Sequence, residues 1–259
     1  MDFTHTTGLL ALGLFCGVLA CLEFGRWLGR RWATRNPDEA KSRAAATLES
    51  AVFGLMALLI AFSFGGASSR FDLRRHLIVE ETNAIGTAWL RLDMLPSSAQ
   101  PGMRALFRQY VDARLEVYER LPDVKAASAA MEQSVKLQND IWSAAVAACR
   151  SEEGQRVAIL VLPALNNLID ITTTRTMAAK THPPMIIFVL MFGLALGSMV
   201  LAGYDHAQAQ GRSWIHIIAF AALLTVTVYI IIDLEFPRLG LIRVDAFDDV
   251  LVGLRQSMG

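Results

Sequence analysis

The sequence predicts an all-α, four-transmembrane-helix membrane protein with an inserted extramembrane helical bundle. The 259 residues are 54% hydrophobic and only 19% charged, whereas soluble domains average about 45–50% apolar and about 25% charged residues. Four long uncharged runs interrupt the chain. The polar stretch between the second and third runs carries apolar residues at helical spacing and no alternating strand pattern.

Each uncharged run is long enough, or nearly so, to cross a bilayer, which takes about 20 apolar residues. Because backbone groups in lipid must be hydrogen-bonded within the segment, we expect these runs to be helices. The runs are Gly8–Leu22 (extendable to Leu28), Ser50–Ser69, Pro183–Tyr204 and Ser213–Ile232.

The first run has two interpretations. Cys21 ends a stretch with a faint likeness to a lipoprotein cleavage site, so the run could be a signal peptide. A signal peptide carries its positive charges before the apolar run. Here the arginines follow it, beginning at Arg26, so we expect a retained helix whose Glu23 and Arg26 reach toward the headgroups.

This pattern divides the chain into three parts. Residues 1–69 form a first transmembrane hairpin, and 182–259 form a second hairpin with a C-terminal tail. Residues 70–181 form the extramembrane bundle. With no breaker except Gly65-Gly66, the helix of 70–95 should continue the second membrane helix as one rod. Further helices are expected over about 103–121, 126–150 and 155–179, the last with a kink at Pro163.

Charge and cysteine content exclude some functions and compartments. The 24 basic residues balance 24 acidic ones, so the chain lacks the basic surplus of a nucleic-acid-binding protein. Three cysteines cannot form a disulfide framework.

The loop after the first run is rich in arginine, which favours a cytoplasmic loop and an outside N-terminus. Arginines after the second and fourth runs give the opposing signal.

Signatures of catalysis are absent from the sequence. There is no CxxC, HExxH, GxSxG or phosphate-loop motif. His76 has Asp72 and Glu80 four residues to either side, but a di-metal bundle would need Glu-x-x-His pairs on two helices. We therefore expect pairing within the helix, no metal, no cofactor and no enzymatic activity.

The most polar stretch of the long helix holds the first group of candidate site residues. Glu80, Asn83 and Thr87 lie near one helical face. The row could form a polar contact between helices or face solvent. It could also line a passage in an oligomer.

Candidate neck residues lie in the apolar part of the same helix. Phe53, Ala57, Ile60 and Phe64 share a face that could contact lipid, pack within one subunit or form a constriction. Glu49 is within one turn of the helix start, where the interface and the helix dipole can stabilise a carboxylate. If the helix lines a pore, Arg70, Arg74 and Arg75 at its mouth would attract anions.

Several segments together are similar to a known family. They are Ser63-Phe64, Ser69-Arg70-Phe71-Asp72-x-Arg74-Arg75, Glu80-Glu81-x-Asn83-Ala84-Ile85-Gly86-Thr87, Leu162-Pro163-Ala164-Leu165-Asn166 and Gly240-Leu241-Ile242-Arg243-Val244. The chain resembles the bacterial bestrophin-like domain family, and more distantly the bestrophin anion channels. That resemblance implies four membrane helices per subunit, a pentamer, and a pore lined by the second membrane helix with its neck at Phe53, Ala57, Ile60 and Phe64.

From these observations we expect an oligomeric ion channel that prefers anions. The expected partners are the lipid bilayer, further copies of the chain and inorganic ions, and the expected location is a bacterial inner membrane. The alternative is a non-conducting membrane scaffold or sensor that binds a partner through its helical domain.

Overall fold

The computed structural model describes residues 3–35, 43–121, 123–208 and 213–259, and this part of the chain is helical without strands. It forms two compact units. A membrane unit comprises Met1–Ser69 and His182–Phe236, and a polar unit comprises Arg70–Thr181 and Pro237–Gly259. The last 23 residues, which the sequence grouped with the second hairpin, thus belong to the polar unit.

The membrane unit contains four helices that are long and apolar enough to cross a bilayer. The helix α1 spans Phe3–Arg35, α7 spans Met185–Asp205, and α8 spans Trp214–Glu235. The fourth is the first half of α2, which spans Arg43–Arg91. A short 3-10 turn, η2, follows α7 at His206–Gln208. The predicted all-α fold with four membrane helices is confirmed.

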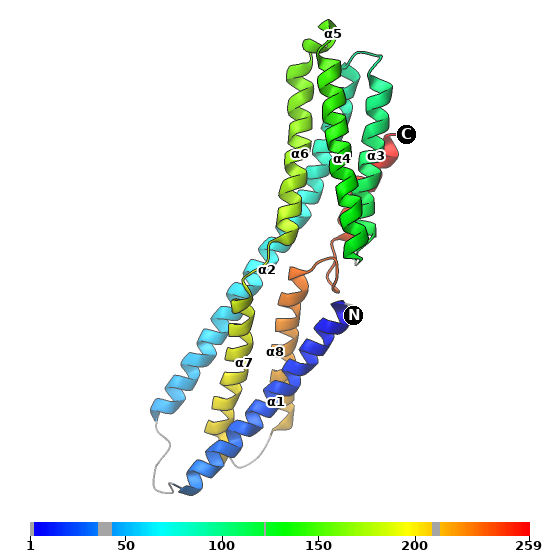
Figure 1. Cartoon of the computed structure of the whole chain (residues 1–259). Helices are drawn as coiled ribbons and strands as arrows, with labels where there is room; N and C mark the ends of the chain where they lie inside the picture. The colour runs from blue at the N-terminus through cyan, green and yellow to red at the C-terminus, as the bar shows by residue number, and fades with distance from the viewer. Residues whose placement is uncertain (1–2, 36–42, 122, 209–212) are drawn as a thin grey trace. The chain divides into compact units, whose positions relative to one another are not determined.

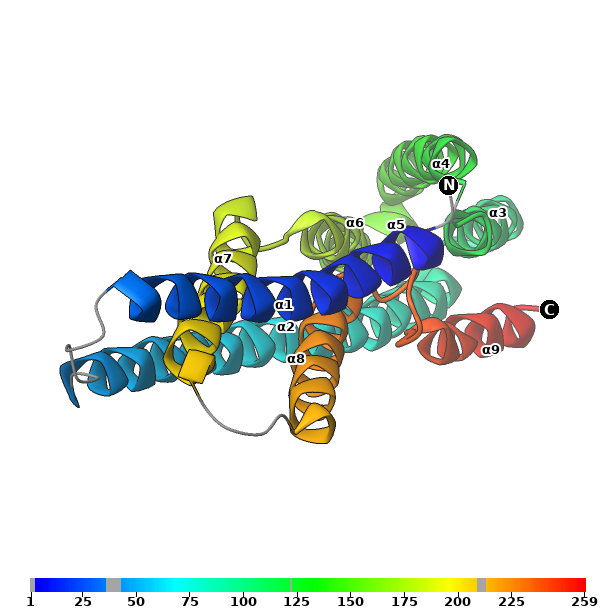
Figure 2. The ribbon, with the colours of Figure 1, turned by 90° about the horizontal axis from the view of Figure 1, so that it is seen from below.

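Glycines set the contact between α1 and α7, which Figure 2 shows crossing within the membrane unit. A Cβ atom on Gly25 would overlap the carbonyl oxygen of Val200, and one on Gly203 would overlap that of Leu22. A Cβ atom on Gly29, one turn beyond Gly25, would lie 2.5 Å from the carbonyl oxygen of Tyr204. Small residues four apart let membrane helices approach at backbone distance, and this GxxxG pair holds α1 on α7.

The second membrane helix continues without a break into the polar unit. The helix α2 is 49 residues long, and Figure 1 draws it as one continuous helix. Gly65 and Gly66 do not interrupt it, since membrane helices tolerate glycine. It ends in the 3-10 turn η1, Leu92–Met94, just before Pro96.

The polar unit is built from α2 and the helices that follow it. They are α3 (Gln100–Glu119), α4 (Val124–Cys149), α5 (Glu152–Gln155) and α6 (Ala158–Lys180), and the C-terminal segment adds η3 (Asp245–Phe247) and α9 (Asp249–Ser257). Asp123 caps α4 by accepting from the backbone N–H groups of Lys125 and Ala126, both at 3.1 Å. The helix α6 runs through Pro163.

The core of the polar unit is apolar and fixes how α2 is rotated. Ile85 and Leu92 of α2 are fully buried, as are Phe107 of α3 and Leu165 of α6. Burying each such side chain contributes about 1.5–3 kcal/mol. Because these positions of α2 must face the core, the opposite side of the helix is left exposed.

Candidate functional site

One exposed row of residues runs along nearly the whole length of α2. Its members follow one another in steps of three and four, which places them on one side of an α-helix. All are exposed in the described structure. The row, called the α2 stripe below, consists of Ser50, Gly54, Ala57, Ala61, Gly65, Ser69, Asp72, His76, Glu80, Asn83, Thr87 and Leu90.

The α2 stripe changes character between the two units. In the membrane unit its side chains are small, and a Cβ atom on Gly54 or Gly65 would meet nothing within 4 Å. In the polar unit the stripe is mostly polar, from Asp72 to Thr87. The opposite side of the membrane half is the packed side, where Met56 and Ala67 are buried.

A second exposed row borders the α2 stripe and differs from it in size. Leu55, Leu58 and Phe62 are 54%, 52% and 71% exposed. Bulky apolar side chains suit contact with lipid, whereas small residues in membrane helices suit close approach of another helix. The exposed surface of α2 therefore divides into a bulky face and a small-residue face.

The structure separates the candidate pore residues into two groups. Ala57, Glu80, Asn83 and Thr87 lie on the α2 stripe, and Phe64 is 45% exposed beside it. The other candidates are partly buried: Glu49, Phe53 and Ile60. Phe53 turns to the inside of the membrane unit, where its ring meets Phe220 edge-on at 6.2 Å.

The three candidate ion-attracting arginines lie off the α2 stripe. Arg74 is buried, and its guanidinium donates to the carbonyl oxygens of Ala178 at 3.2 Å and Thr181 at 2.8 Å. These carbonyls end α6, where a helix favours a cation. The Arg75 guanidinium lies 4.4 Å from the Phe247 ring. Arg70 is partly buried.

The charges on the stripe itself are acidic. Asp72 accepts from Arg75 at 3.1 Å, and Glu80 lies 3.0 Å from the Nε2 atom of His76. No Lys or Arg lies on the stripe. The polar half of the stripe therefore carries two carboxylates and one histidine.

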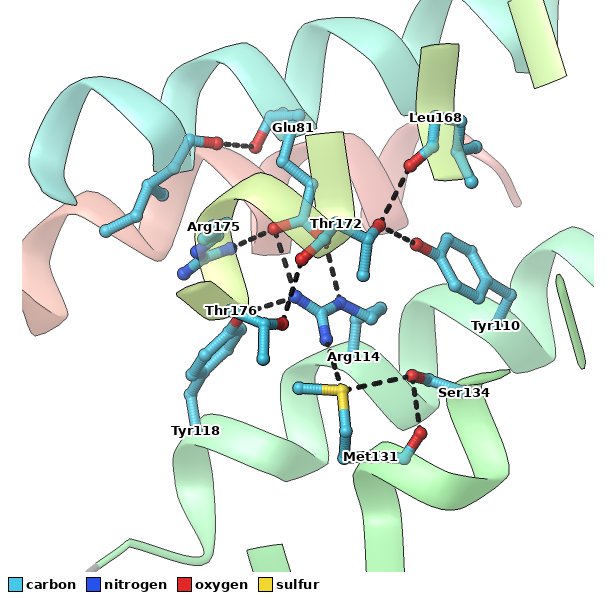
Figure 3. A network of polar contacts seen from close by, with 12 residues as sticks. Glu81, Tyr110, Arg114, Tyr118, Met131, Ser134, Leu168, Thr172, Arg175 and Thr176 are labelled. Carbon is cyan, nitrogen blue, oxygen red and sulfur yellow. Dashed lines mark hydrogen bonds and ion pairs between the residues drawn. The ribbon is translucent and has the colours of Figure 1, made fainter. Parts of the chain in front are cut away.

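Directly behind the polar half of the stripe is a buried ion network that was not predicted from the sequence. Glu81 and Arg114 are both fully buried in the polar unit. Arg114 donates from Nε to Oε1 of Glu81 at 2.7 Å and from Nη2 to Oε2 at 3.1 Å. Figure 3 shows Arg175 of α6 reaching the same carboxylate from another direction. One carboxylate thus joins α2, α3 and α6.

The network extends to the C-terminal segment. Arg175 also donates to Oδ1 of Asp248 at 3.1 Å. Arg238 holds Asp248 with two bonds, from Nη1 to Oδ2 at 2.6 Å and from Nη2 to Oδ1 at 3.0 Å. Acidic and basic side chains alternate along this series of contacts, so each buried charge has a neighbour of opposite sign. These ion pairs bind residues 237–259 to the helical bundle.

Tyr118 covers the arginines of the network. Its ring centroid is 4.1 Å from the Arg175 guanidinium carbon and 4.2 Å from that of Arg238. Its hydroxyl accepts from Arg114 at 2.5 Å. Burial raises the pKa of the Tyr118 phenol, and the Arg114 guanidinium offsets part of that rise. The tyrosine is therefore a neutral cation–π partner.

One signal in the sequence could have found this network. Glu81 falls on the same helical face as Ile78, Ile85 and Ala88, which are all buried. Arg114 likewise shares a face with Phe107 and Tyr110. A charged residue on an apolar face requires a buried partner of opposite charge. The polar pattern of the sequence pointed instead to Glu80, which is exposed.

The chemistry available at these sites is electrostatic. Among the described residues, no group of three or more His, Cys, Asp or Glu side chains could hold a metal ion. The charges of the Glu81 network neutralise one another, and their contacts fix the rotation of α2 about its axis. The stripe is the side of α2 that is left exposed.

Comparison with known proteins gives one fold and one family. A crystal structure of a bacterial bestrophin homologue from Klebsiella pneumoniae, carrying a point mutation, matches with a TM-score of 0.66 over 98% of both chains at 12% identity. No curated protein matches the sequence. The model of the bestrophin-like domain matches residues 16–246. The protein therefore belongs to the bestrophin-like family and has the bestrophin fold.

Proposed function

We propose that the chain is a subunit of a homo-oligomeric ion channel in a bacterial inner membrane, with the α2 stripe lining the pore. The observation that carries this proposal is the unbroken exposed row of small, then polar, residues along α2. Lipid alone gives no reason for a small-residue face beside a bulky one. Copies arranged around an axis would turn the bulky row outward and the small row inward.

The two halves of the stripe would have different roles in such a pore. Ala57 and Phe64, bordered by Phe53 and Ile60, would form an apolar neck, which gates by excluding water. Glu80, Asn83 and Thr87 would line a wider polar vestibule. Glu49 would lie at the opposite mouth. The bestrophin-like family and fold support this arrangement.

The ion preference follows from the charges that face the axis. The sequence predicted anions because of Arg70, Arg74 and Arg75. Arg74 is bound to the end of α6, however, while the stripe carries Asp72 and Glu80. We therefore propose that a pore lined by the stripe favours cations, and the anion preference is the alternative to be tested.

The test is ion flux through the purified full chain in liposomes, with potassium and chloride gradients applied separately. We expect potassium flux, reduced about tenfold or more by Ala57→Leu because the side chain narrows the neck. The matched control is Ala51→Leu, the same change on the bulky exposed row of the same helix, which should leave the flux unchanged. Equal effects of both variants would contradict a pore at the stripe.

The vestibule variant tests the ion preference. Glu80→Gln should lower the potassium-to-chloride flux ratio by about threefold, since one carboxylate per subunit is lost. Glu116→Gln, an exposed ion-paired carboxylate on α3, is the control. Chloride-selective flux would overturn the cation preference. An oligomer of folded chains that passes neither ion would favour the scaffold or sensor.

A further inference from the structure

The membrane unit also contains a cavity, which shares Phe53 with the border of the proposed neck. It has a volume of about 700 Å³ and is lined by residues of α1, α2, α7, η2 and α8. Its walls are mostly apolar, including Leu22 and Phe220. One end is polar, with Arg26, His206, Ser213 and His216. No carboxylate of a described residue lines it.

Arg26 is the unusual member of this lining. It is only 8% exposed, and its Nε atom is buried without a hydrogen-bond partner among the described residues. No ion pair with a described residue neutralises it either. Arg30, one turn further along α1, differs because it donates to the Ala207 carbonyl at 3.4 Å. A buried charge without a partner is costly, so the Arg26 guanidinium is suited to an anion from outside the chain.

Aromatic side chains indicate the depth of Arg26 in the membrane. Trp27, Trp32, Tyr204 and Trp214 lie at this end of the membrane unit and are 51%, 40%, 38% and 50% exposed. Trp and Tyr are enriched at the level of the lipid headgroups. Arg26 is next to Trp27, whereas Leu22 lies one turn deeper along α1. The polar end of the cavity is therefore at headgroup depth, and its apolar walls extend toward the hydrocarbon.

We infer that this cavity binds an anionic phospholipid, with the phosphate at Arg26 and an acyl chain along Leu22 and Phe220. Basic pockets between membrane helices recognise anionic headgroups. A free phosphate would leave the apolar walls without contact, whereas a phospholipid fills both ends. His216 shares a 2.5 Å hydrogen bond with Ser213 at the rim, where both can contact a headgroup. The inference does not depend on the channel function.

The experiment measures thermal stability of the purified full chain in detergent, with dioleoylphosphatidylglycerol, dioleoylphosphatidylcholine or inorganic phosphate added. A ligand that binds the folded state raises the melting temperature by mass action. We expect phosphatidylglycerol to bind about tenfold more tightly than phosphatidylcholine. Inorganic phosphate alone should give no shift. A shift with phosphate equal to that with phosphatidylglycerol would show a site for free anions and overturn the lipid.

Two variants locate the site, and a third is the control. Arg26→Gln should abolish the preference for phosphatidylglycerol. Arg31→Gln removes the same charge from the exposed side of α1, where Arg31 lies over Trp27. This control variant should retain the preference for phosphatidylglycerol. Ala219→Trp places an indole in the cavity and should weaken binding of phosphatidylglycerol without changing charge. A preference that survives both Arg26→Gln and Ala219→Trp would overturn the proposal.

Discussion

The buried arginines of the two units differ in whether an acidic side chain neutralises them. In the polar unit, Arg114 is fully buried and has a bidentate partner in Glu81. In the membrane unit, Arg26 is nearly as buried and has no partner among the described residues. The polar unit neutralises its charges internally, whereas the membrane unit exposes a cation to a cavity. The buried charge of Arg114 therefore stabilises the fold, whereas that of Arg26 is available to a ligand.

The forces that join helices differ in the same way. In the polar unit, an alternating network connects three helices and the C-terminal segment, and it consists of Arg114, Glu81, Arg175, Asp248 and Arg238. In the membrane unit, α1 is held on α7 by backbone contact at Gly25 and Gly203. Lipid offers no hydrophobic drive for helix association, so close packing has to supply it.

The largest effect should come from removing the central carboxylate. Glu81→Gln leaves Arg114 and Arg175 buried without their shared anion, so the free energy of unfolding should fall by about 3–5 kcal/mol. Thermal melting of the purified protein measures this. Glu80→Gln, one residue away but exposed, should change stability by less than about 0.5 kcal/mol. Equal losses in the two variants would mean that the network does not hold the polar unit together.

A smaller effect should follow from a methyl group between α1 and α7. Gly25→Ala places a Cβ atom against the backbone of Val200, and overpacking of this kind costs about 1–3 kcal/mol. Gly13→Ala on the same helix is the control, because a Cβ atom there meets nothing within 4 Å. Melting of both variants in one detergent checks this. If Gly25→Ala is as stable as Gly13→Ala, backbone contact does not define the membrane unit.

The smallest effect concerns a neutral polar cluster beside the ion network. Tyr110 shares a 3.0 Å hydrogen bond with Thr172 and accepts from Gln138 at 3.2 Å. Tyr110→Phe should lower the free energy of unfolding by about 1 kcal/mol, since Gln138 still donates to Thr172.

Tyr110 also makes the stability of the folded chain depend on pH. Burial raises the pKa of Tyr110 from 10.0 to about 12. The folded chain therefore keeps the phenolic proton when the unfolded chain has lost it, and stability falls as pH rises from about 10 to about 12, by at most about 1.4 kcal/mol per pH unit. Absorbance of tyrosinate against pH should lose a component that titrates near pH 12 in Tyr110→Phe. A titration identical to that of the wild type would contradict the raised pKa.

The sequence predicted which residues of α2 share a helical face, but it did not predict which face of the membrane half is exposed. Spacing along the chain placed Glu80, Asn83 and Thr87 on one face, and the lack of breakers predicted that the second membrane helix continues as one rod. Spacing could not distinguish which face was exposed in the apolar half, where every side is hydrophobic. Contacts with α8 turn Phe53 inward, so Gly54, Ala61 and Gly65 lie on the exposed side instead.

The sequence by itself determined the helices, because apolar runs of membrane length and the lack of breakers in α2 are local properties. It also determined the family resemblance. Only the tertiary structure decided which charges meet. Glu81 and Arg175 are 94 residues apart in the chain and yet share an ion pair, and Arg26 has no such partner among the described residues. Pairing over such distances depends on how helices pack in space, which no local pattern specifies.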